Sequence, residues 1–365
     1  MNRIAVLGAG AGGSAAAVEL TGKGHRVSLW NRSPQTLAPH QALGGIDYEG
    51  VLGEGFIPLK TITADLAEAV DGADAILICL PTFIHAQIAR ALAELRIGKI
   101  PVVLNPGHTG GALEFRHAFL QVDSHLPPLA EFSTLTYVAR KTTPVRVNVT
   151  GRARSVRIGA LPGGEAALAA AQAMFASASP VSDVLASDLS NANLVLHPPG
   201  AVLGAAWVEA RHGDFTFYVD GMTPGVARVM ALLDSERRSV ARALGHELPP
   251  LVDEMKRIGT VDDIHADPAD LRAAIAGGKA NARIKAPDSL QHRYYLEDFG
   301  HGLVPFTAIA RVAAVATPVA DALIELGEAL TGIAFREVGR TAASMGIAGM
   351  NRATLMALVR GNEHD

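Results

Sequence analysis

The chain has 365 residues, which is enough for two domains that each bury a core of their own. Its formal charge of -4 and its pI near 6.4 exclude the basic surface on which nucleic-acid-binding proteins depend. A single cysteine, Cys79, excludes an intramolecular disulfide and a zinc–thiolate cluster, and its apolar surroundings in the sequence predict an inert thiol in a buried strand.

The chain shows no membrane or metal signature. Its most apolar C-terminal stretch is interrupted by Pro318, Asp321 and Glu325, so it is too short to span a bilayer. Arg3 and the small apolar residues after it resemble the start of a signal peptide, but Glu19 and the early glycines argue against one. No group of histidines or carboxylates has the spacing of metal ligands. We therefore expect a cytoplasmic protein that binds no metal, membrane or nucleic acid.

The first predicted elements are a strand over residues 3–7, a helix that ends near residue 22 or 24, and a strand over residues 25–30. Gly8, Gly10 and Gly13 form a G-x-G-x-x-G pattern between the first strand and the helix. In this strand–turn–helix context the pattern predicts a dinucleotide-binding loop rather than a chance glycine-rich turn.

Each glycine of the loop has a physical role in such a site. Gly8 permits the tight turn, Gly10 lets the backbone approach the pyrophosphate, and Gly13 lets helix and strand pack closely. The loop also includes Ala11 and Gly12, and the helix N-terminus offers free N–H groups to the phosphates. We expect all five residues to belong to the cofactor site.

The end of the second strand predicts which cofactor is used. An acidic residue there would accept hydrogen bonds from the ribose of NAD, but this chain has Asn31, followed by Arg32 and Ser33. Asn31 does not repel a 2′-phosphate, and Arg32 can pair with one. We therefore expect NADP(H), with NAD(H) as the alternative cofactor and a merely solvated Arg32 as the alternative interpretation.

Helices and strands continue to alternate, which predicts a parallel, doubly wound sheet. Ligands bind beyond the carboxyl ends of such strands, which places Pro81 in the cofactor site and His85 and His108 near its mouth, although loop histidines are more often incidental. The β-type alternation over residues 129–160 predicts strands that extend the sheet. The alternating elements are a helix over 63–73, a strand over 74–81, a helix over 82–95 and a strand over 101–107.

From about residue 183 the pattern becomes helical. The predicted fold is thus α/β plus all-α. A Rossmann domain over residues 1–183 precedes a helical substrate and catalytic domain over residues 184–365, with the active site in the cleft between them.

The stretch NANLVLHPPG, residues 191–200, places His197 before two prolines. Pro198 and Pro199 lack an N–H, so the helix is predicted to stop or kink at His197. Freed carbonyls and a polar ring suit a cleft better than a core, and Asn191 close by must also find partners. A core histidine at a kinked helix is the alternative.

A second polar stretch, HRYYLEDFGHGLVPF, covers residues 292–306. Its functional interpretation is a carboxylate that orients a histidine and an arginine, Arg293, that holds an anionic substrate. The alternative is a helix start capped by Glu297 or Asp298.

Four stretches resemble the motifs of the opine dehydrogenase family and occur in the same order: residues 104–116, 191–200, 293–305 and 335–341. The resemblance implies the reductive condensation of an α-keto acid with the amino group of an amino acid, an NAD(P)H cofactor and a homodimer. It also implies that His197 and Asp298 form the catalytic pair, so we expect Asp298 within hydrogen-bond reach of the His197 ring.

The chemistry of this reaction suits such residues. Carbinolamine formation and loss of water need an acid and a base that work near neutral pH, as histidine does. A carboxylate on the other ring nitrogen fixes the tautomer and stabilises the imidazolium. Arg293 is expected to clamp the keto-acid carboxylate, and Asn193 is expected to join it in binding substrate.

Two other functions fit part of the pattern. Ketopantoate reductases and β-hydroxyacid dehydrogenases use a lysine on the interdomain helix, but this chain has no lysine between Lys141 and Lys256. A non-catalytic NADP-binding sensor would be expected to lose the polar residues at positions 197, 293 and 298, and here all three are polar.

Overall fold

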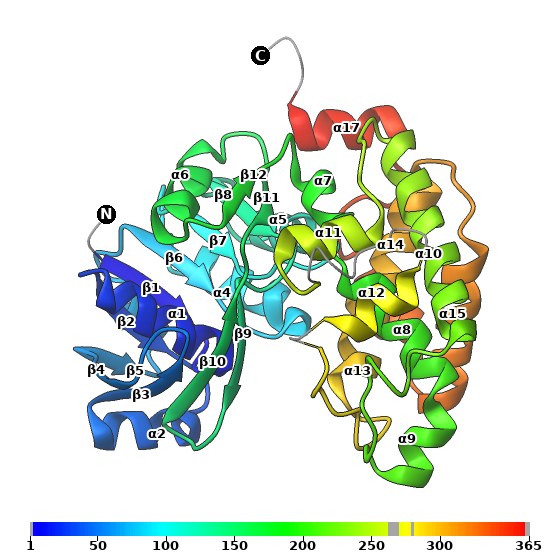
Figure 1. The fold of residues 1–365 in the computed structure, drawn as a ribbon. Helices are drawn as coiled ribbons and strands as arrows, with labels where there is room; N and C mark the ends of the chain where they lie inside the picture. Colours follow the sequence, from blue (N-terminus) through cyan, green and yellow to red (C-terminus); the bar gives the residue numbers. More distant parts are fainter. Residues whose placement is uncertain (1–2, 262–269, 279–280, 362–365) are drawn as a thin grey trace. The chain divides into compact units, whose positions relative to one another are not determined.

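The computed structural model describes residues 3–261, 270–278 and 281–361 (Figure 1). The chain forms two compact units. The first holds the residues up to Gly107 together with Phe115–Val184, and the second holds His108–Glu114 together with the residues from Leu185 onward. The short segment His108–Glu114 thus groups with the helical part of the chain, although the sequence places it between elements of the first unit.

The first unit is built on an eight-stranded sheet with β1 near its middle, parallel to β2 on one side and to β6 on the other. All described pairings in this eight-stranded sheet are parallel except that of β8 with β11. The predicted doubly wound Rossmann architecture is confirmed. In spatial order the strands are β12 (Ala178–Pro180), β11 (Val156–Ala160), β8 (Leu129–Phe132), β7 (Val102–Leu104), β6 (Ala75–Ile78), β1 (Arg3–Leu7), β2 (Arg26–Trp30) and β5 (Thr61–Thr63).

Helices connect these strands as the alternating pattern predicts. Local signals set their starts: Pro34 is the first residue of α2, and the Ser33 hydroxyl accepts a hydrogen bond from the N–H of Thr36 as its N-cap. The helices are α1 (Ala11–Gly22), α2 (Pro34–Leu43), α3 (Leu66–Val70), α4 (His85–Glu94), α5 (Gly111–Leu120) and α6 (Glu165–Met174), with a 3-10 turn at Thr82–Ile84.

The prediction that all strands over residues 129–160 extend the main sheet is wrong for the middle two. β8 and β11 do extend it, but β9 (Tyr137–Lys141) and β10 (Arg146–Arg152) form a second sheet with β3 (Gly45–Gly50) and β4 (Gly55–Pro58). Alternation predicts a strand with one buried face but does not select its neighbours. Here that face packs on α1.

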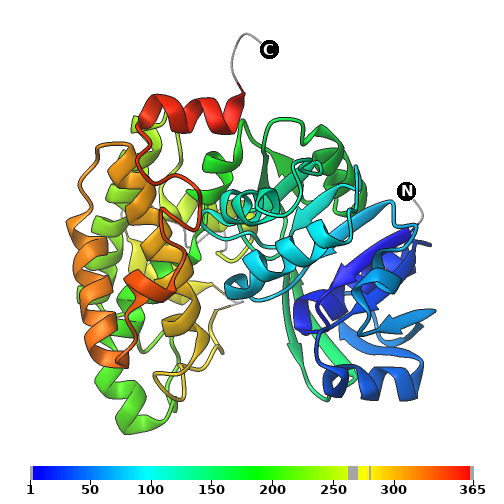
Figure 2. The ribbon, with the colours of Figure 1, turned by 180° about the vertical axis from the view of Figure 1, so that it is seen from behind.

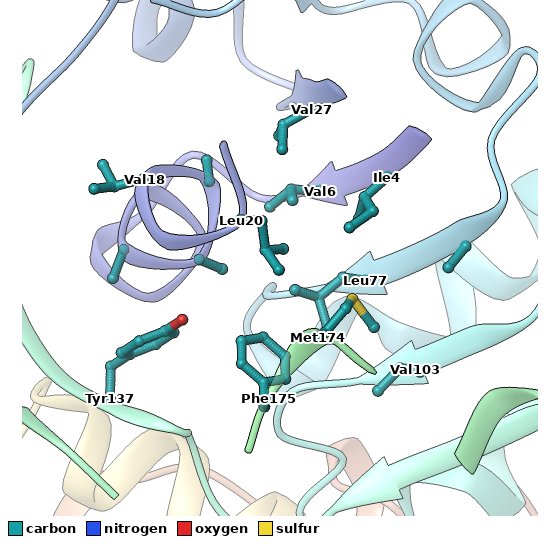
Figure 3. Close-up of a cluster of buried hydrophobic side chains, with 14 of the residues drawn as sticks. Ile4, Val6, Val18, Leu20, Val27, Leu77, Val103, Tyr137, Met174 and Phe175 are labelled. Carbon is teal, nitrogen blue, oxygen red and sulfur yellow. The ribbon is translucent and has the colours of Figure 1, made fainter. Parts of the chain in front are cut away.

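The core of the first unit surrounds α1 and the inner strands (Figure 3). Leu20 of α1 points toward Val6 and Leu77 of the sheet and toward Phe175, while Val18, of the same cluster, lies on the other side of α1. All are buried, and each such side chain contributes roughly 1.5–3 kcal/mol relative to an exposed one. This packing holds the start of α1 firmly against the end of β1, where the glycine loop lies.

The second unit is helical, as predicted. α8 is its central helix and packs against α10, α13 and α15, while α10 and α15 lie side by side in both views (Figures 1 and 2). The helices are α7 (Val184–Asp188), α8 (Asn193–Leu203), α9 (Ala205–Arg211), α10 (Pro224–Ala243), α11 (Leu251–Ile258), α12 (Leu271–Gly277), α13 (Arg293–Asp298), α14 (Val304–Val312), α15 (Pro318–Thr331), α16 (Phe335–Val338) and α17 (Arg352–Arg360), with a π-helical segment at Phe299–Leu303.

The sequence predicts a helix that stops or kinks at His197, and the stop is wrong. α8 starts at Asn193 and continues through Pro198 and Pro199, so the break lies before His197 and separates α8 from α7. The Asn191 side chain accepts a hydrogen bond from the N–H of Asn193, a local turn that competes with helix at that point. The prolines then lie only one to two turns into a buried helix, where packing outweighs the loss of two backbone hydrogen bonds.

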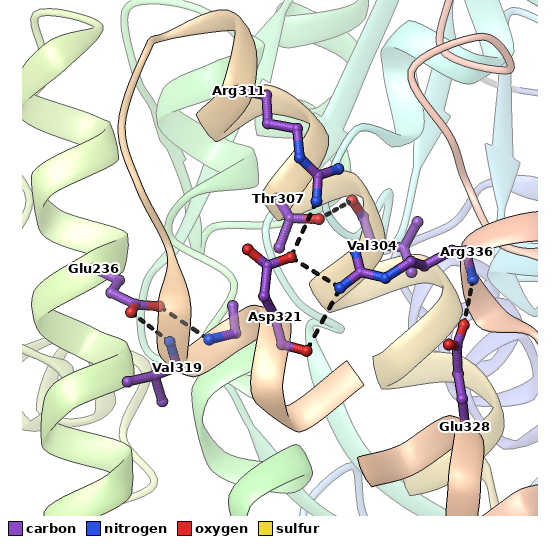
Figure 4. A network of polar contacts seen from close by, with 9 residues as sticks. Glu236, Val304, Thr307, Arg311, Val319, Asp321, Glu328 and Arg336 are labelled. Atoms are coloured by element: carbon purple, nitrogen blue, oxygen red, sulfur yellow. Dashed lines mark hydrogen bonds and ion pairs between the residues drawn. The ribbon is translucent and has the colours of Figure 1, made fainter. Parts of the chain in front are cut away.

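A polar network fixes α15 within the second unit (Figure 4). Glu236 of α10 accepts hydrogen bonds from the backbone N–H groups of Val319 and Ala320 at the start of α15. Asp321 accepts from Arg311 and Arg336 at 3.0 and 2.9 Å. Among the described residues, no helix is both long and apolar enough to cross a bilayer.

Candidate active site

The glycine loop of the first unit leaves the start of α1 open to a ligand. Gly8 has φ +121°, and a Cβ there would lie 2.3 Å from the Cys79 carbonyl oxygen. A Cβ on Gly13 would lie 1.8 Å from the Gly8 oxygen, whereas one on Gly10 would meet nothing within 4 Å. Gly8 and Gly13 are therefore glycines because of packing, but Gly10 borders free space. No side chain caps the first N–H groups of α1, so they can bind phosphate.

The residues after β2 have three different roles in the structure. The Asn31 side chain accepts a hydrogen bond from the N–H of Ala9 at 3.2 Å, so it ties the end of β2 to the glycine loop. Arg32 is exposed, and its guanidinium donates to the Gln87 side chain at 2.9 Å. Ser33 caps α2. Of the three, only Arg32 offers a positive charge at the surface.

The other residues predicted beside this loop divide into exposed and buried ones. Pro81 is exposed and precedes the 3-10 turn at Thr82–Ile84. His85 is fully buried, and its Nε2 lies 3.3 Å from the Leu80 carbonyl oxygen, which fits a structural histidine. The sequence predicts Cys79 in a buried strand, but it directly follows β6 and is half-buried; desolvation raises the pKa of its thiol to about 12, so the thiol stays protonated at neutral pH.

In the second unit, the predicted contact between His197 and Asp298 is present. The Nδ1 atom of His197, on α8, lies 2.7 Å from Oδ2 of Asp298, the last residue of α13, and both residues are almost fully buried. Because a carboxylate only accepts, this geometry places the proton on Nδ1. Asp298 also precedes the π-helical segment, but its side chain makes no capping hydrogen bond, so the capping alternative is wrong for this residue.

Aromatic residues enclose the His197 ring. Tyr294 stacks on one face with a centroid distance of 3.7 Å, and Phe217 approaches edge-on at 6.2 Å. The Tyr218 hydroxyl lies 2.8 Å from His197 Nε2. Burial raises the pKa of Tyr218 well above its usual value, with a further contribution from its hydrogen bond to Tyr294, so Tyr218 remains a hydrogen-bond donor at neutral pH.

Arg293 and Asn193 lie beside this pair. Arg293 is the first residue of α13, is exposed, and has its guanidinium carbon 5.7 Å from the centre of the Tyr294 ring. The protein around the guanidinium lowers its pKa by partial desolvation, but the nearby charges, first that of Asp298, outweigh this effect and raise the pKa. Asn193 is half-buried and lies one turn before His197, so both side chains point from the same face of α8.

His108 belongs to a separate buried polar cluster of the second unit. Its Nδ1 lies 3.3 Å from the Asn191 amide nitrogen, and Arg340 binds both Glu114 (2.9 Å) and the Thr109 carbonyl (2.7 Å). Burial lowers the pKa of His108, partly opposed by Glu297 and Asp298. This cluster explains why His108–Glu114 groups with the helices: the fully buried Arg340 anchors it there.

Sequence reasoning missed two residues of these sites. Tyr218 lies in a loop between α9 and α10 with no recognisable motif, so only the fold brings it to His197. Arg340 lies in the stretch 335–341, which the family resemblance marked without indicating a role. The described residues contain no cluster of three or more potential metal ligands.

A glycine loop on a Rossmann unit and a His–Asp pair in a helical unit define an NAD(P)-dependent oxidoreductase. Residues 180–331 match the family described as NAD/NADP octopine/nopaline dehydrogenase, alpha-helical domain, and residues 3–107 match the N-terminus of NAD-dependent glycerol-3-phosphate dehydrogenase. The opine dehydrogenase of Arthrobacter sp. (strain 1C) is 33% identical to this chain over 97% of the chain and 98% of the relative. The chain belongs to the opine dehydrogenase family.

Solved structures agree in fold. Octopine dehydrogenase in complex with NADH and agmatine has a TM-score of 0.78 at 20% identity and covers 100% of this chain and 99% of its own. Yersinopine dehydrogenase with NADP+ bound has a TM-score of 0.73 at 17% identity, with 99% and 98% covered. A ketopantoate reductase from Ralstonia eutropha JMP134 has a TM-score of only 0.61 and covers 90% of this chain. Neither alternative function is favoured by these matches.

Proposed function

We propose that this protein is an NADPH-dependent opine dehydrogenase in which His197 and Asp298 provide acid–base catalysis. As a member of its family it catalyses the NAD(P)H-dependent reductive condensation of an α-keto acid with the amino group of an amino acid. The observation that carries the assignment of roles is the buried 2.7 Å contact between His197 and Asp298. A histidine with a merely structural role could be satisfied by a backbone carbonyl, without the cost of burying a carboxylate beside its Nδ1.

The first unit fits a dinucleotide. The free space at Gly10 and the uncapped start of α1 can take a pyrophosphate, and Arg32 can leave Gln87 to pair with a 2′-phosphate. Gly8, Ala11, Gly12, Gly13, Asn31, Ser33 and Pro81 complete the proposed cofactor site. When bound, the reduced nicotinamide supplies the hydride that reduces the imine carbon.

The residues of the second unit handle the protons. The neutral amine attacks the keto carbon, and the resulting carbinolamine loses its hydroxyl as water once a proton reaches that oxygen. His197 moves this proton, and Asp298 holds its ring and stabilises the imidazolium. The other oxygen of Asp298, Oδ1, is buried and has no hydrogen-bond partner in the described part of the chain. No second donor therefore weakens the attraction of this carboxylate for the imidazolium.

Arg293 and Asn193 are the proposed substrate-binding residues. The exposed guanidinium of Arg293 can clamp the keto-acid carboxylate bidentately, and the amide of Asn193 lies one helical turn from His197. Octopine dehydrogenase has been solved with NADH and L-arginine and with NADH and pyruvate, which supports an amino acid and a small α-keto acid as the two substrates here. We further propose a cytoplasmic homodimer, which sedimentation of the purified protein would test.

The test is a matrix of α-keto acids against amino acids, in which the loss of NADPH absorbance is followed for each pair. The proposal expects turnover only when both substrates are present, and a secondary amine as product by mass spectrometry. Matched reactions with His197→Ala should turn over about 10²-fold or more slowly. NADPH oxidation with the keto acid alone would instead indicate a simple hydroxyacid dehydrogenase.

A further inference from the structure

The His197 ring has no nitrogen left for a substrate. Nδ1 is held by Asp298 at 2.7 Å and Nε2 by the Tyr218 hydroxyl at 2.8 Å, while the stacked Tyr294 ring covers one face. An acid–base histidine must exchange a proton through one of its nitrogens. Since Asp298 keeps Nδ1, the exchange has to pass the Tyr218 hydroxyl.

We propose that Tyr218 is the proton relay through which His197 exchanges protons with the substrate, an inference that rests on the proposed function. When His197 is an imidazolium, its Nε2 proton moves to the Tyr218 oxygen while the Tyr218 proton moves to the carbinolamine hydroxyl, which leaves as water. His197 ends neutral and Tyr218 ends as a protonated phenol. When His197 acts as base, both transfers run in reverse.

Tyr218 is built for a fixed position. The ring of Phe217, the residue before it, lies against α8, where a Cβ on Gly200 would be only 2.6 Å from it. The Phe217 N–H donates to the Ile284 carbonyl at 2.9 Å. The Tyr218 hydroxyl is further held by a hydrogen bond to Tyr294. The glycine of the sequence HPPG thus has a physical purpose: it admits the loop that carries the phenol to His197.

Several ionisable groups surround the chain of hydrogen bonds. Asp298 and Arg293 lie on α13 with Tyr294, and His292 caps that helix. Burial lowers the pKa of His292, as do the charges of Arg293 and His197. Because the raised pKa of Tyr218 keeps the phenol protonated, the relay operates by passing protons on and not by forming a phenolate.

The experiment compares Tyr218→Phe with Tyr295→Phe in steady-state assays. Tyr295 lies on α13, and its buried hydroxyl donates to the Ala201 carbonyl of α8 at 2.8 Å, so its loss weakens the packing of the two helices that carry Asp298 and His197 without touching His197. The relay predicts that Tyr218→Phe lowers kcat about tenfold or more, as lost proton transfer does, with both substrate KM values and NADPH affinity changed less than about threefold. Tyr295→Phe should retain most of the wild-type kcat, and the solvent deuterium isotope effect on kcat should change only in Tyr218→Phe.

Unchanged kcat in Tyr218→Phe would overturn the relay, as would a higher kcat with a lower KM, because that result marks Tyr218 as a latch that substrate displaces. An equal loss in Tyr295→Phe would overturn it too, since the loss would then be structural. If Tyr218→Phe does not fold, 3-fluorotyrosine at position 218 keeps the hydroxyl and the ring but makes the phenol more acidic, and an unchanged kcat with an unchanged solvent isotope effect there overturns the relay. Wild-type turnover tests the proposed function; the ratio of variant to wild-type kcat tests the relay alone.

Discussion

His197 and Asp298 are separated by 101 positions in the sequence, yet their side chains meet at 2.7 Å inside one helical unit. The pair joins the centre of α8 to the last residue of α13, and these two helices are packed against each other. A buried carboxylate beside a buried imidazole is costly unless the two act together, because an isolated charge loses its hydration.

If the pair acts as a unit, its two members should be equally necessary. We expect His197→Ala and Asp298→Asn each to lower kcat by about 10²-fold or more, the usual contribution of acid–base catalysis. The double variant should be scarcely slower than the slower single variant. Equilibrium binding of NADPH, followed by fluorescence, should match that of the wild type. Multiplicative losses in the double variant would mean that the two residues act independently.

The first unit was predictable because its signals are local. The strand–glycine–helix unit around Gly8–Gly13 is recognisable within about thirty residues. Each further helix and strand in the alternation then adds to the same sheet. The second sheet was not predictable, since β3 and β10 pair across about a hundred residues that carry no pairing code.

The candidate site was predictable only where a motif marks it. His197, Arg293 and Asp298 lie in recognisable stretches. Tyr218 comes from a loop that no motif marks. Both the hydrogen bond of the Asn191 side chain and the two prolines can interrupt a helix, and in the structure the break occurs at the hydrogen bond, before Asn193. The outcome of such a competition depends on tertiary packing, which the local sequence does not encode.

Cofactor choice depends on Arg32, the exposed arginine after β2. We expect Arg32→Ala to raise KM for NADPH at least about tenfold and to leave KM for NADH nearly unchanged, because a charge-assisted hydrogen bond contributes roughly 1.5–3 kcal/mol. Gln87→Ala is the matched control, since it removes only the present partner of Arg32 and should preserve NADPH affinity. Equal KM values of the wild type for NADPH and NADH would contradict the assignment.

Alanine substitutions at Gly10 and Gly13 should have different effects, the first on cofactor binding and the second on stability. A Cβ on Gly10 meets open space, so Gly10→Ala should unfold at the wild-type temperature but bind NADPH about tenfold or more weakly, the cost of a lost charge-assisted contact. A Cβ on Gly13 would lie 1.8 Å from the Gly8 oxygen, so Gly13→Ala should lose about 1–3 kcal/mol of stability or more. Thermal unfolding without and with NADPH separates the two effects. A stable Gly13→Ala protein would show that α1 can shift.

Arg340 should be a structural residue. It is fully buried and paired with Glu114 at 2.9 Å, so Arg340→Met should cost about 3–5 kcal/mol by leaving a buried carboxylate alone. Arg311→Met is the control. The Arg311 side chain is 61% exposed and pairs with Asp321, so its loss should cost no more than about 1 kcal/mol of stability. Urea unfolding measures both. A tolerated Arg340→Met would mean that Thr109 and Glu114 are held by other contacts.

His301, in the π-helical segment, should make the second unit sensitive to acid. Burial, together with the charges of Arg340 and His108, lowers the pKa of His301 to about 3, while the unfolded chain keeps a pKa near 6.5. Between pH 6.5 and 3 the unfolded state therefore binds more protons, so stability falls as the pH falls through this window. From pH 6.5 to 5 one such group lowers the free energy of unfolding by about 2 kcal/mol.

His301→Gln, which cannot titrate, should lose less stability than the wild type between pH 7 and pH 5, as measured by the urea unfolding midpoint at each pH. His125→Gln serves as the control because that ring is 89% exposed, and it should behave as the wild type does. Identical acid sensitivity of His301→Gln and the wild type would show that His301 is protonated in the folded protein at little cost.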